Sequence, residues 1–224
     1  MNKPRILVLT AAGRTGMPVA LQLLSEGFPV TAFVHKADQR SERLKAKGAD
    51  IVVGSLTDIT DMRTAMAGVQ RAYVCFPNAA GYLKGAAIFT AVAAEHHLET
   101  VVAMSQWLSN PNHPAIQTRE IWLADRLFAL LPGTAVTFIN PGFFADDEMQ
   151  VLPFAAQFGL LPLPSPVMRM LTGVVYGVMS RSLRVSNRRF KEASGWQPEV
   201  PNARVGWACL AKEGKAAEPI KKGA

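Results

Sequence analysis

The chain has 224 residues, 49% of them hydrophobic and 18% charged, which is enough apolar material for a buried core and excludes a largely disordered chain. Its two cysteines exclude a disulfide framework and a Cys-rich zinc site, so we expect a reducing, cytoplasmic location and no bound metal. The net charge of +7 comes mostly from residues 181–224, where Lys and Arg outnumber Asp and Glu by ten to four. Such charge runs usually face solvent, and no aromatic residues lie among the final lysines, so no nucleic-acid partner is expected.

Short β-rich runs alternate with segments of helical periodicity through the first 140 residues. The expected strands are 5–10, 29–34, 50–53, 72–76, 99–104 and 135–139. The expected helices are 15–26, 39–47, 58–67, 80–97 and 115–131. Glycines that follow the helices, among them Gly27 and Gly48, are typical helix stops. This alternation predicts an α/β fold with a doubly wound parallel sheet of the Rossmann type.

The first and fifth expected strands are apolar at successive positions, 6–9 and 101–104. Parallel strands that are covered by helices on both faces have this composition. We therefore expect both strands to be buried from both sides.

The alternating pattern stops after Asn140, and residues 151–224 are expected to form a small, mainly helical lobe with a basic tail. Four prolines in 151–168 disfavour a membrane-spanning helix there. The apolar side chains of this stretch fit equally the roof of an apolar pocket and a subunit interface, so a homo-oligomer stays open.

The segment from Thr10 to Gly16 lies where the first expected strand turns into the first expected helix. Gly13 and Gly16 match two positions of a GxxGxxG spacing, and Thr10 stands at the first. Small residues let the backbone approach a diphosphate, and the helix N-terminus offers unpaired N–H groups. Together with Ala12, Arg14 and Thr15, these residues predict a pyrophosphate site in a dinucleotide-binding domain over residues 1–150.

The residues after the second expected strand bear on the choice of dinucleotide. NAD-specific sites usually place an acidic residue there, whereas this chain has His35 and Lys36, with Arg14 in the glycine turn. Cationic groups favour a 2′-phosphate, so NADP is expected and NAD stays possible. Asp38 and Arg40 lie close by and make the local charge mixed.

Four segments together carry a family resemblance: 10–16, the Gly-Ser-Leu-Thr-Asp turn at 54–58, Ala-Gly-Val at 67–69, and Asn-Pro-Gly-Phe-Phe at 140–144. They resemble the NmrA-like branch of the atypical short-chain dehydrogenases/reductases over about residues 4–150. The resemblance implies an NAD(P)-binding Rossmann fold in a quinone or imine-type reductase or in a redox-sensing regulator. Residues 184–207 are more similar to the C-terminal end of extended, epimerase-like relatives.

The resemblance also implies further cofactor contacts. Ser55 and Leu56 would border the adenine, and Phe76 and Pro77 would line the adjoining ribose. Pro141 and Phe143 would flank the nicotinamide. The family more often has Asp where this chain has Ser55, and its reductases usually have longer substrate domains.

The catalytic pair of classical members is absent from the sequence. These enzymes use a Tyr with a Lys four residues later. The three tyrosines Tyr73, Tyr82 and Tyr176 are followed at that distance by Pro77, Ala86 and Ser180.

Two other residues are candidates for catalysis. Ser105 follows the fifth expected strand, at the edge where ligands bind, and either bonds a substrate oxygen or caps the strand. His113, before the fifth helix, is the best remaining proton donor, because an imidazole group can exchange a proton at neutral pH, or else it is a solvated loop residue.

The sequence therefore predicts an NAD(P)H-dependent oxidoreductase that acts on a small apolar quinone or carbonyl compound. The alternative is a non-catalytic NAD(P)-sensing regulatory protein, which the missing Tyr–Lys pair and the basic tail favour.

Overall fold

The structure, a computed structural model, describes residues 3–142 and, beyond them, residues 192, 195 and 197. The chain divides into two compact units, residues 1–142 and 143–224. The expected C-terminal lobe at 151–224 lies outside the described residues, apart from those three positions, and stays a prediction.

The described part contains a six-stranded sheet in which all neighbours are parallel, in the order β3-β2-β1-β4-β5-β6. The strands are β1 (Ile6–Val8), β2 (Val30–Val34), β3 (Asp50–Val53), β4 (Arg71–Val74), β5 (Thr100–Met104) and β6 (Ala135–Ile139). This is the doubly wound order of dinucleotide-binding sheets, in which the direction of winding reverses between β1 and β4. The predicted fold class is confirmed, and the strand bounds differ from the expected ones by two residues at most.

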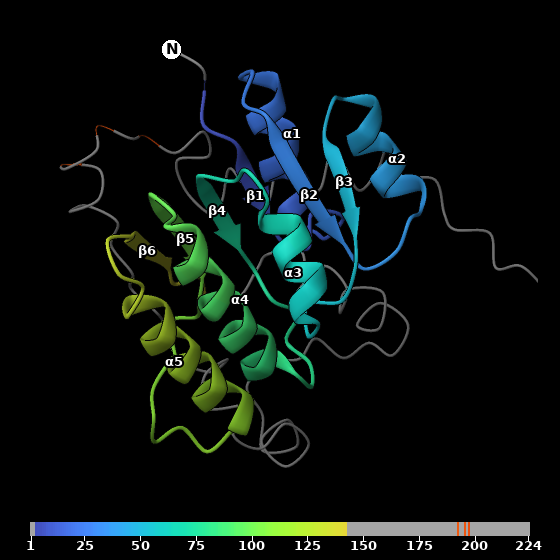
Figure 1. Cartoon of the computed structure of the whole chain (residues 1–224). Helices are drawn as coiled ribbons and strands as arrows, with labels where there is room; N and C mark the ends of the chain where they lie inside the picture. Colours follow the sequence, from blue (N-terminus) through green and yellow to red (C-terminus); the bar gives the residue numbers. More distant parts are fainter. Residues whose placement is uncertain (1–2, 143–191, 193–194, 196, 198–224) are drawn as a thin grey trace, which may run out of the picture. The chain divides into compact units, whose positions relative to one another are not determined.

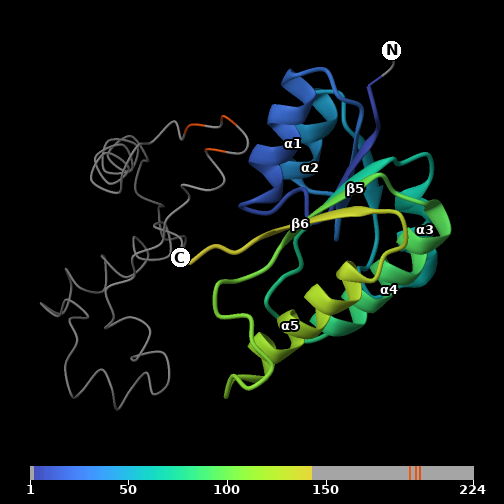
Figure 2. The ribbon, with the colours of Figure 1, turned by 90° about the vertical axis from the view of Figure 1, so that its left-hand side faces the viewer.

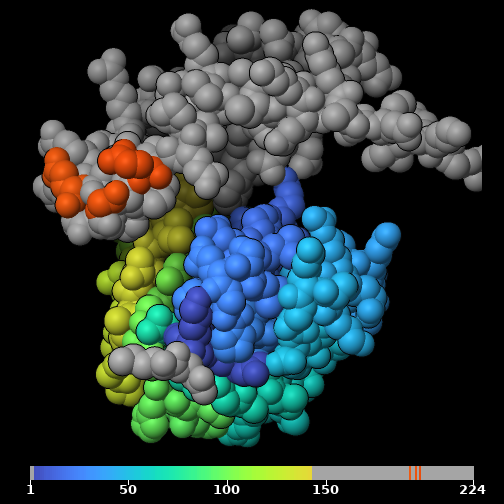
Figure 3. Space-filling view, turned by 90° about the horizontal axis from the view of Figure 1, so that it is seen from above, coloured from blue at the N-terminus to red at the C-terminus, as the bar shows by residue number. Residues whose placement is uncertain are grey.

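Helices cover the sheet in two layers. They are α1 (Gly16–Ser25), α2 (Gln39–Ala46), α3 (Ile59–Met66), α4 (Tyr82–His96) and α5 (Ile116–Ala129). Figures 1 and 2 show α1 and α2 on one face of the sheet and α3, α4 and α5 on the other. In the space-filling view the surfaces of α1 and α2 lie side by side, in two shades of blue (Figure 3).

Two hydrophobic clusters pack between these layers, one on each face of the sheet. Leu7 and Leu9 of the β1 region pack with Phe89 of α4 and Phe128 of α5 in the first cluster. Val8 packs in the second cluster, under α1 and α2. Since successive residues of a strand point to opposite faces, β1 is buried from both sides, as its composition predicts.

The expectation of burial from both sides is only half met in β5. Val101 and Ala103 are fully buried in the first cluster, whereas Val102 and Met104 are only partly buried. On the next strand, Ile139 is 42% exposed. Among the described elements, α1 and α2 pack on β1, β2 and β3, and this same face of β5 and β6 is less well covered.

The packing of the first cluster predicts a large loss of stability for Phe89→Ala. The ring is fully buried and meets Phe128 edge to face at a centroid distance of 5.7 Å. Removing it leaves a cavity, and we expect the free energy of unfolding to fall by about 3–5 kcal/mol in urea titrations. The control is Leu123→Ala on α5, whose side chain is 42% exposed, with an expected change within about 0.5 kcal/mol. Equal losses in the two variants would contradict this packing.

Candidate functional site

The turn that follows β1 is held in place by both neighbouring strands. The Leu9 amide donates to the carbonyl of Tyr73 on β4 at 3.0 Å, and the Ala11 amide donates to the carbonyl of Phe33 on β2 at 3.0 Å. Thr10 between them has a left-handed backbone, with φ at +50°, and its hydroxyl lies 2.9 Å from the Cys75 carbonyl. The turn therefore has a fixed position at the carboxyl edge of the sheet.

The two glycines of this turn allow its close packing. A Cβ on Gly13 would lie 3.0 Å from the Thr10 carbonyl oxygen, and a Cβ on Gly16 would overlap the same oxygen and the backbone of Ala11. The first turn of α1 thus packs directly on the backbone that leaves β1. Unpaired N–H groups at such a helix start bind phosphate oxygens, and a backbone without side chains lets a diphosphate approach. The geometry fits the pyrophosphate of a dinucleotide.

Polar groups lie beneath this turn. The Thr15 hydroxyl lies 3.4 Å from the Cys75 sulfur, and the Tyr73 hydroxyl is buried without a hydrogen-bond partner among the described residues. Burial raises the pKa of the Tyr73 phenol, and the neighbouring Thr15 hydroxyl opposes this effect to a smaller extent. Buried polar atoms without partners are rare in native proteins and point to a group that completes them.

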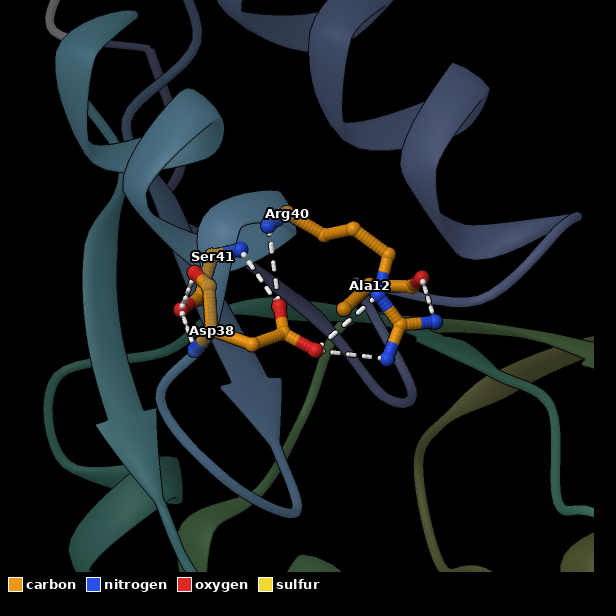
Figure 4. A network of polar contacts seen from close by, with 4 residues as sticks. All are labelled: Ala12, Asp38, Arg40 and Ser41. Carbon is orange, nitrogen blue, oxygen red and sulfur yellow. Dashed lines mark hydrogen bonds and ion pairs between the residues drawn. The ribbon is translucent and has the colours of Figure 1, made fainter. Parts of the chain in front are cut away.

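The loop between β2 and α2 places an arginine beside the glycine turn (Figure 4). Two nitrogens of the Arg40 guanidinium donate to Asp38 Oδ2, Nη2 at 2.7 Å and Nε at 3.1 Å. Its Nη1 donates to the Ala12 carbonyl at 3.2 Å. Asp38 Oδ1 accepts from the amides of Arg40 and Ser41 and so caps α2.

Both oxygens of the one carboxylate in this loop are therefore occupied. The hydrogen bond from Arg40 lowers the pKa of Asp38, and Asp38 in turn raises the pKa of Arg40. Asp38 is hydrogen-bonded to the amides at the start of α2 and to Arg40, and the Arg40 guanidinium is exposed beside the glycine turn. The charges of Asp38 and Arg40 offset one another in this ion pair, which places the exposed guanidinium beside the glycine turn.

The other predicted cationic residues lie around the same place. His35 and Lys36 follow β2 directly and are exposed, and Arg14 is exposed in the glycine turn. The structure thus brings the residues expected near a 2′-phosphate to one end of the sheet edge, and adds Arg40 to them.

The residues expected around the adenine and its ribose are more enclosed. The Ser55 hydroxyl lies 3.0 Å from that of Thr57, within its own turn, and Leu56 is partly buried. The Phe76 ring is buried and packs edge to face on Tyr82, at 5.5 Å between ring centroids, while Pro77 is exposed. Their cofactor contacts remain predictions.

Ser105 belongs to a buried polar group at the end of β5. Its hydroxyl donates to Asp125 Oδ2 on α5 at 2.6 Å, and the Ser109 hydroxyl donates to the same oxygen at 2.8 Å. Burial first, and the negative charge of Asp125 second, raise the pKa of the Tyr82 phenol. The Gln106 side-chain nitrogen nearby in the chain is buried and has no partner among the described residues.

His113 has a local structural contact. Its Nδ1 accepts from the Ala115 amide at 3.1 Å, where α5 begins, and its carbonyl accepts from Arg119 at 3.1 Å. No hydrogen bond within the described part links His113 to Ser105, so the two candidates for catalysis are not brought together by a direct contact.

The last predicted residues lie at the boundary of the described part. The Pro141 carbonyl accepts from the Trp107 amide at 3.2 Å, which ties the chain after β6 to the chain after β5. Phe143 lies outside the described residues. Within residues 3–142, no group of three or more His, Cys, Asp or Glu side chains is arranged to hold a metal ion, and no helix is long and apolar enough to cross a membrane.

Comparison with known proteins identifies the family. The model of an NAD(P)H-binding family matches residues 10–150, which is more than half of the chain, and the protein belongs to this family. This match confirms the predicted resemblance to NAD(P)-binding proteins of the atypical short-chain dehydrogenase/reductase type. No curated protein matches the sequence.

Solved structures agree with the fold. An NADPH-dependent quinone oxidoreductase from Escherichia coli superposes with a TM-score of 0.60 at 16% identity, covering 69% of this chain and 54% of that one. A triphenylmethane reductase from Citrobacter sp., complexed with NADP(H), superposes with a TM-score of 0.57 at 14% identity, covering 68% of this chain and 55% of that one. A putative NAD-dependent epimerase/dehydratase from Bacillus halodurans superposes with a TM-score of 0.52 at 20% identity, covering 62% of this chain and 70% of that one. The chain spans little more than half the length of the two reductases, and identities this low show the fold alone.

Sequence reasoning passed over Asp125, and it noted Arg40 only as part of the mixed charge around Asp38. For Arg40 the signal was the helix-capping residue Asp38 two positions earlier, because the cap places Arg40 in the first turn of the helix. For Asp125 the signal was an acidic residue among Ile121, Ala124 and Phe128, on the buried face of a helix. A buried carboxylate needs partners, and the two serines provide them.

The close packing of Gly16 predicts that Gly16→Ala loses dinucleotide binding. The added methyl overlaps the Thr10 carbonyl and pushes the start of α1 away from β1. We expect the dissociation constant for NADPH, measured by fluorescence titration, to rise by at least about tenfold. Pro18→Ala, on the exposed side of the same helix, is the control and should bind as the wild type does. Unchanged binding in Gly16→Ala would refute a diphosphate site at this turn.

Proposed function

We propose that the protein is an NADPH-dependent oxidoreductase that acts on a small apolar quinone or carbonyl compound. The observation that carries this proposal is the close-packed turn Thr10–Gly16 at the start of α1, with the Arg40 guanidinium fixed beside it. The two features together suit a diphosphate and a second phosphate group nearby. Membership of the NAD(P)H-binding family supports the same cofactor class.

The residues of the turn would hold the pyrophosphate, with the backbone of Ala12, Gly13 and Thr15 facing it. Arg40, with Arg14, His35 and Lys36, would hold the 2′-phosphate. An arginine suits this role because its planar guanidinium bonds two phosphate oxygens at once. Asp38, which would otherwise favour the 2′-hydroxyl of NAD, is occupied by the α2 cap and by Arg40.

Hydride transfer at such a site needs little acid–base catalysis from the protein. The reduced nicotinamide, when bound, supplies the hydride. The chain has no Tyr-x-x-x-Lys pair to supply a proton, and in the described part the Ser105 proton is directed at Asp125. Quinone reduction demands less acid catalysis from the protein than carbonyl reduction does, so the quinone is the better substrate class of the two.

The missing Tyr–Lys pair also favours the second candidate function, a non-catalytic NAD(P)-sensing regulator. Such a protein needs the cofactor site but no proton donor. The neighbouring reductase and epimerase structures share the fold without deciding between these functions.

Turnover separates the two candidates. We expect the purified protein to oxidise NADPH with at least one member of a panel of quinones, and faster than with aldehydes, as followed by the NADPH absorbance. Gly16→Ala is the matched control, because it should abolish turnover through loss of the cofactor. Tight NADPH binding with no turnover on any quinone or aldehyde would favour the sensor.

The charge arrangement at the β2–α2 loop predicts a change in cofactor preference. Arg40→Ala removes charge-assisted bonds to the 2′-phosphate, so we expect NADPH binding to weaken by about tenfold or more while NADH binding stays nearly unchanged. Calorimetric titration of both dinucleotides measures the ratio of their dissociation constants.

The matched variant is Asp38→Asn, which keeps an N-cap oxygen for α2 but removes the charge that offsets Arg40. We expect it to bind NADPH more tightly than the wild type does. If Arg40→Ala weakened both dinucleotides equally, the phosphate assignment would be wrong.

A further inference from the structure

Two serine hydroxyls converge on one oxygen of a buried carboxylate at the end of β5. Ser105 and Asp125 are each only 7% exposed, and their side chains are 2.6 Å apart. Ser109 reaches the same Oδ2 atom at 2.8 Å. The distance from Ser105 is typical of a bond from a hydroxyl to an ionised acceptor. Asp125 therefore joins the end of β5 and the loop after it to helix α5.

These bonds fix the direction of the serine protons. A hydroxyl has one proton to donate and two lone pairs that accept. Because Ser105 donates its proton to Asp125, only its lone pairs remain for a ligand. The same holds for Ser109. In this state Ser105 is an acceptor and does not donate to a carbonyl oxygen.

The position of Ser105 along the sheet edge relates it to one half of a dinucleotide. The glycine turn follows β1, and Arg40 lies on the β2 side of it. If Arg40 holds the adenosine 2′-phosphate, the pyridine half extends to the other side, over the ends of β4 and β5. Ser105 follows β5 directly, two strand spacings of about 4.8 Å from β1.

We propose that Asp125 is a positioning residue that makes Ser105 a hydrogen-bond acceptor for the carboxamide N–H of the pyridine ring. This proposal rests on the proposed function, because it needs an NADP-type dinucleotide in the site. It gives Ser105 a role in holding the reacting ring and leaves proton supply to the substrate or to solvent. It also explains why an acidic side chain stands on the buried face of α5.

A pair of cofactors that differ only in the donor group tests the proposal. The 3-acetylpyridine analogue of NADP⁺ keeps the ring carbonyl but has a methyl group where NADP⁺ has the amide N–H. We expect the wild type to bind NADP⁺ more tightly than the analogue by about tenfold, the value of one hydrogen bond. In Ser105→Ala this ratio of dissociation constants should fall close to one.

Two further variants separate positioning from general stability. In Asp125→Leu the Ser105 hydroxyl is free to donate to the ketone of the analogue while its lone pairs can still accept from the amide of NADP⁺. The analogue should therefore bind more tightly, and the ratio should fall part of the way toward one. In Ser109→Ala the bond between Ser105 and Asp125 remains, and the wild-type ratio should be kept. A ratio does not depend on the fraction of folded protein, so a general loss of stability does not alter it.

The outcomes are distinct. If the ratio of dissociation constants were unchanged in Ser105→Ala, this inference would be overturned while the proposed function stands. The same holds if Ser105→Ala lowered the ratio and Asp125→Leu left it unchanged. If the wild type bound neither cofactor at millimolar concentration, the proposed function would fail, and this inference with it.

Discussion

The contact on which the site depends is the approach of Gly16 to the backbone of Thr10. Any side chain at position 16 would overlap the Thr10 carbonyl, so only glycine lets α1 start directly against the end of β1. The neighbouring strands hold the turn from both sides through Tyr73 and Phe33. The hydrophobic clusters then fix the strands, and the helix start keeps its orientation toward the sheet edge. The proposed phosphate site would thus follow from the packing of the fold itself.

A second constraint acts at the start of α2. Asp38 caps the helix and holds the Arg40 side chain, so one carboxylate satisfies the helix amides and orients a cation beside the glycine turn. A carboxylate free to bind the ribose would favour NAD, whereas Asp38 is occupied by the α2 cap and by Arg40. The proposed preference for a phosphate therefore rests on a local capping interaction as much as on net charge.

Sequence reasoning recovered the order, type and approximate bounds of the described elements. It succeeded because apolar periodicity and glycine stops are local signals, and the sheet order follows once strands and helices alternate. The glycine turn was predicted for the same reason. What it missed depends on contacts between distant residues: Arg40 reaches Ala12 across 28 positions, and Asp125 accepts from Ser105 across 20. The partial exposure of Val102 and Met104 was also missed, because strand composition does not tell which helices cover each face.

The central claim is that the turn between β1 and α1 binds the diphosphate of a pyridine dinucleotide. Isothermal calorimetry of the full chain with NADPH and then NADH tests it most directly. The account predicts saturable binding of both at one site per chain, with the tighter constant for NADPH. The absence of heat from either dinucleotide at millimolar concentration would contradict it.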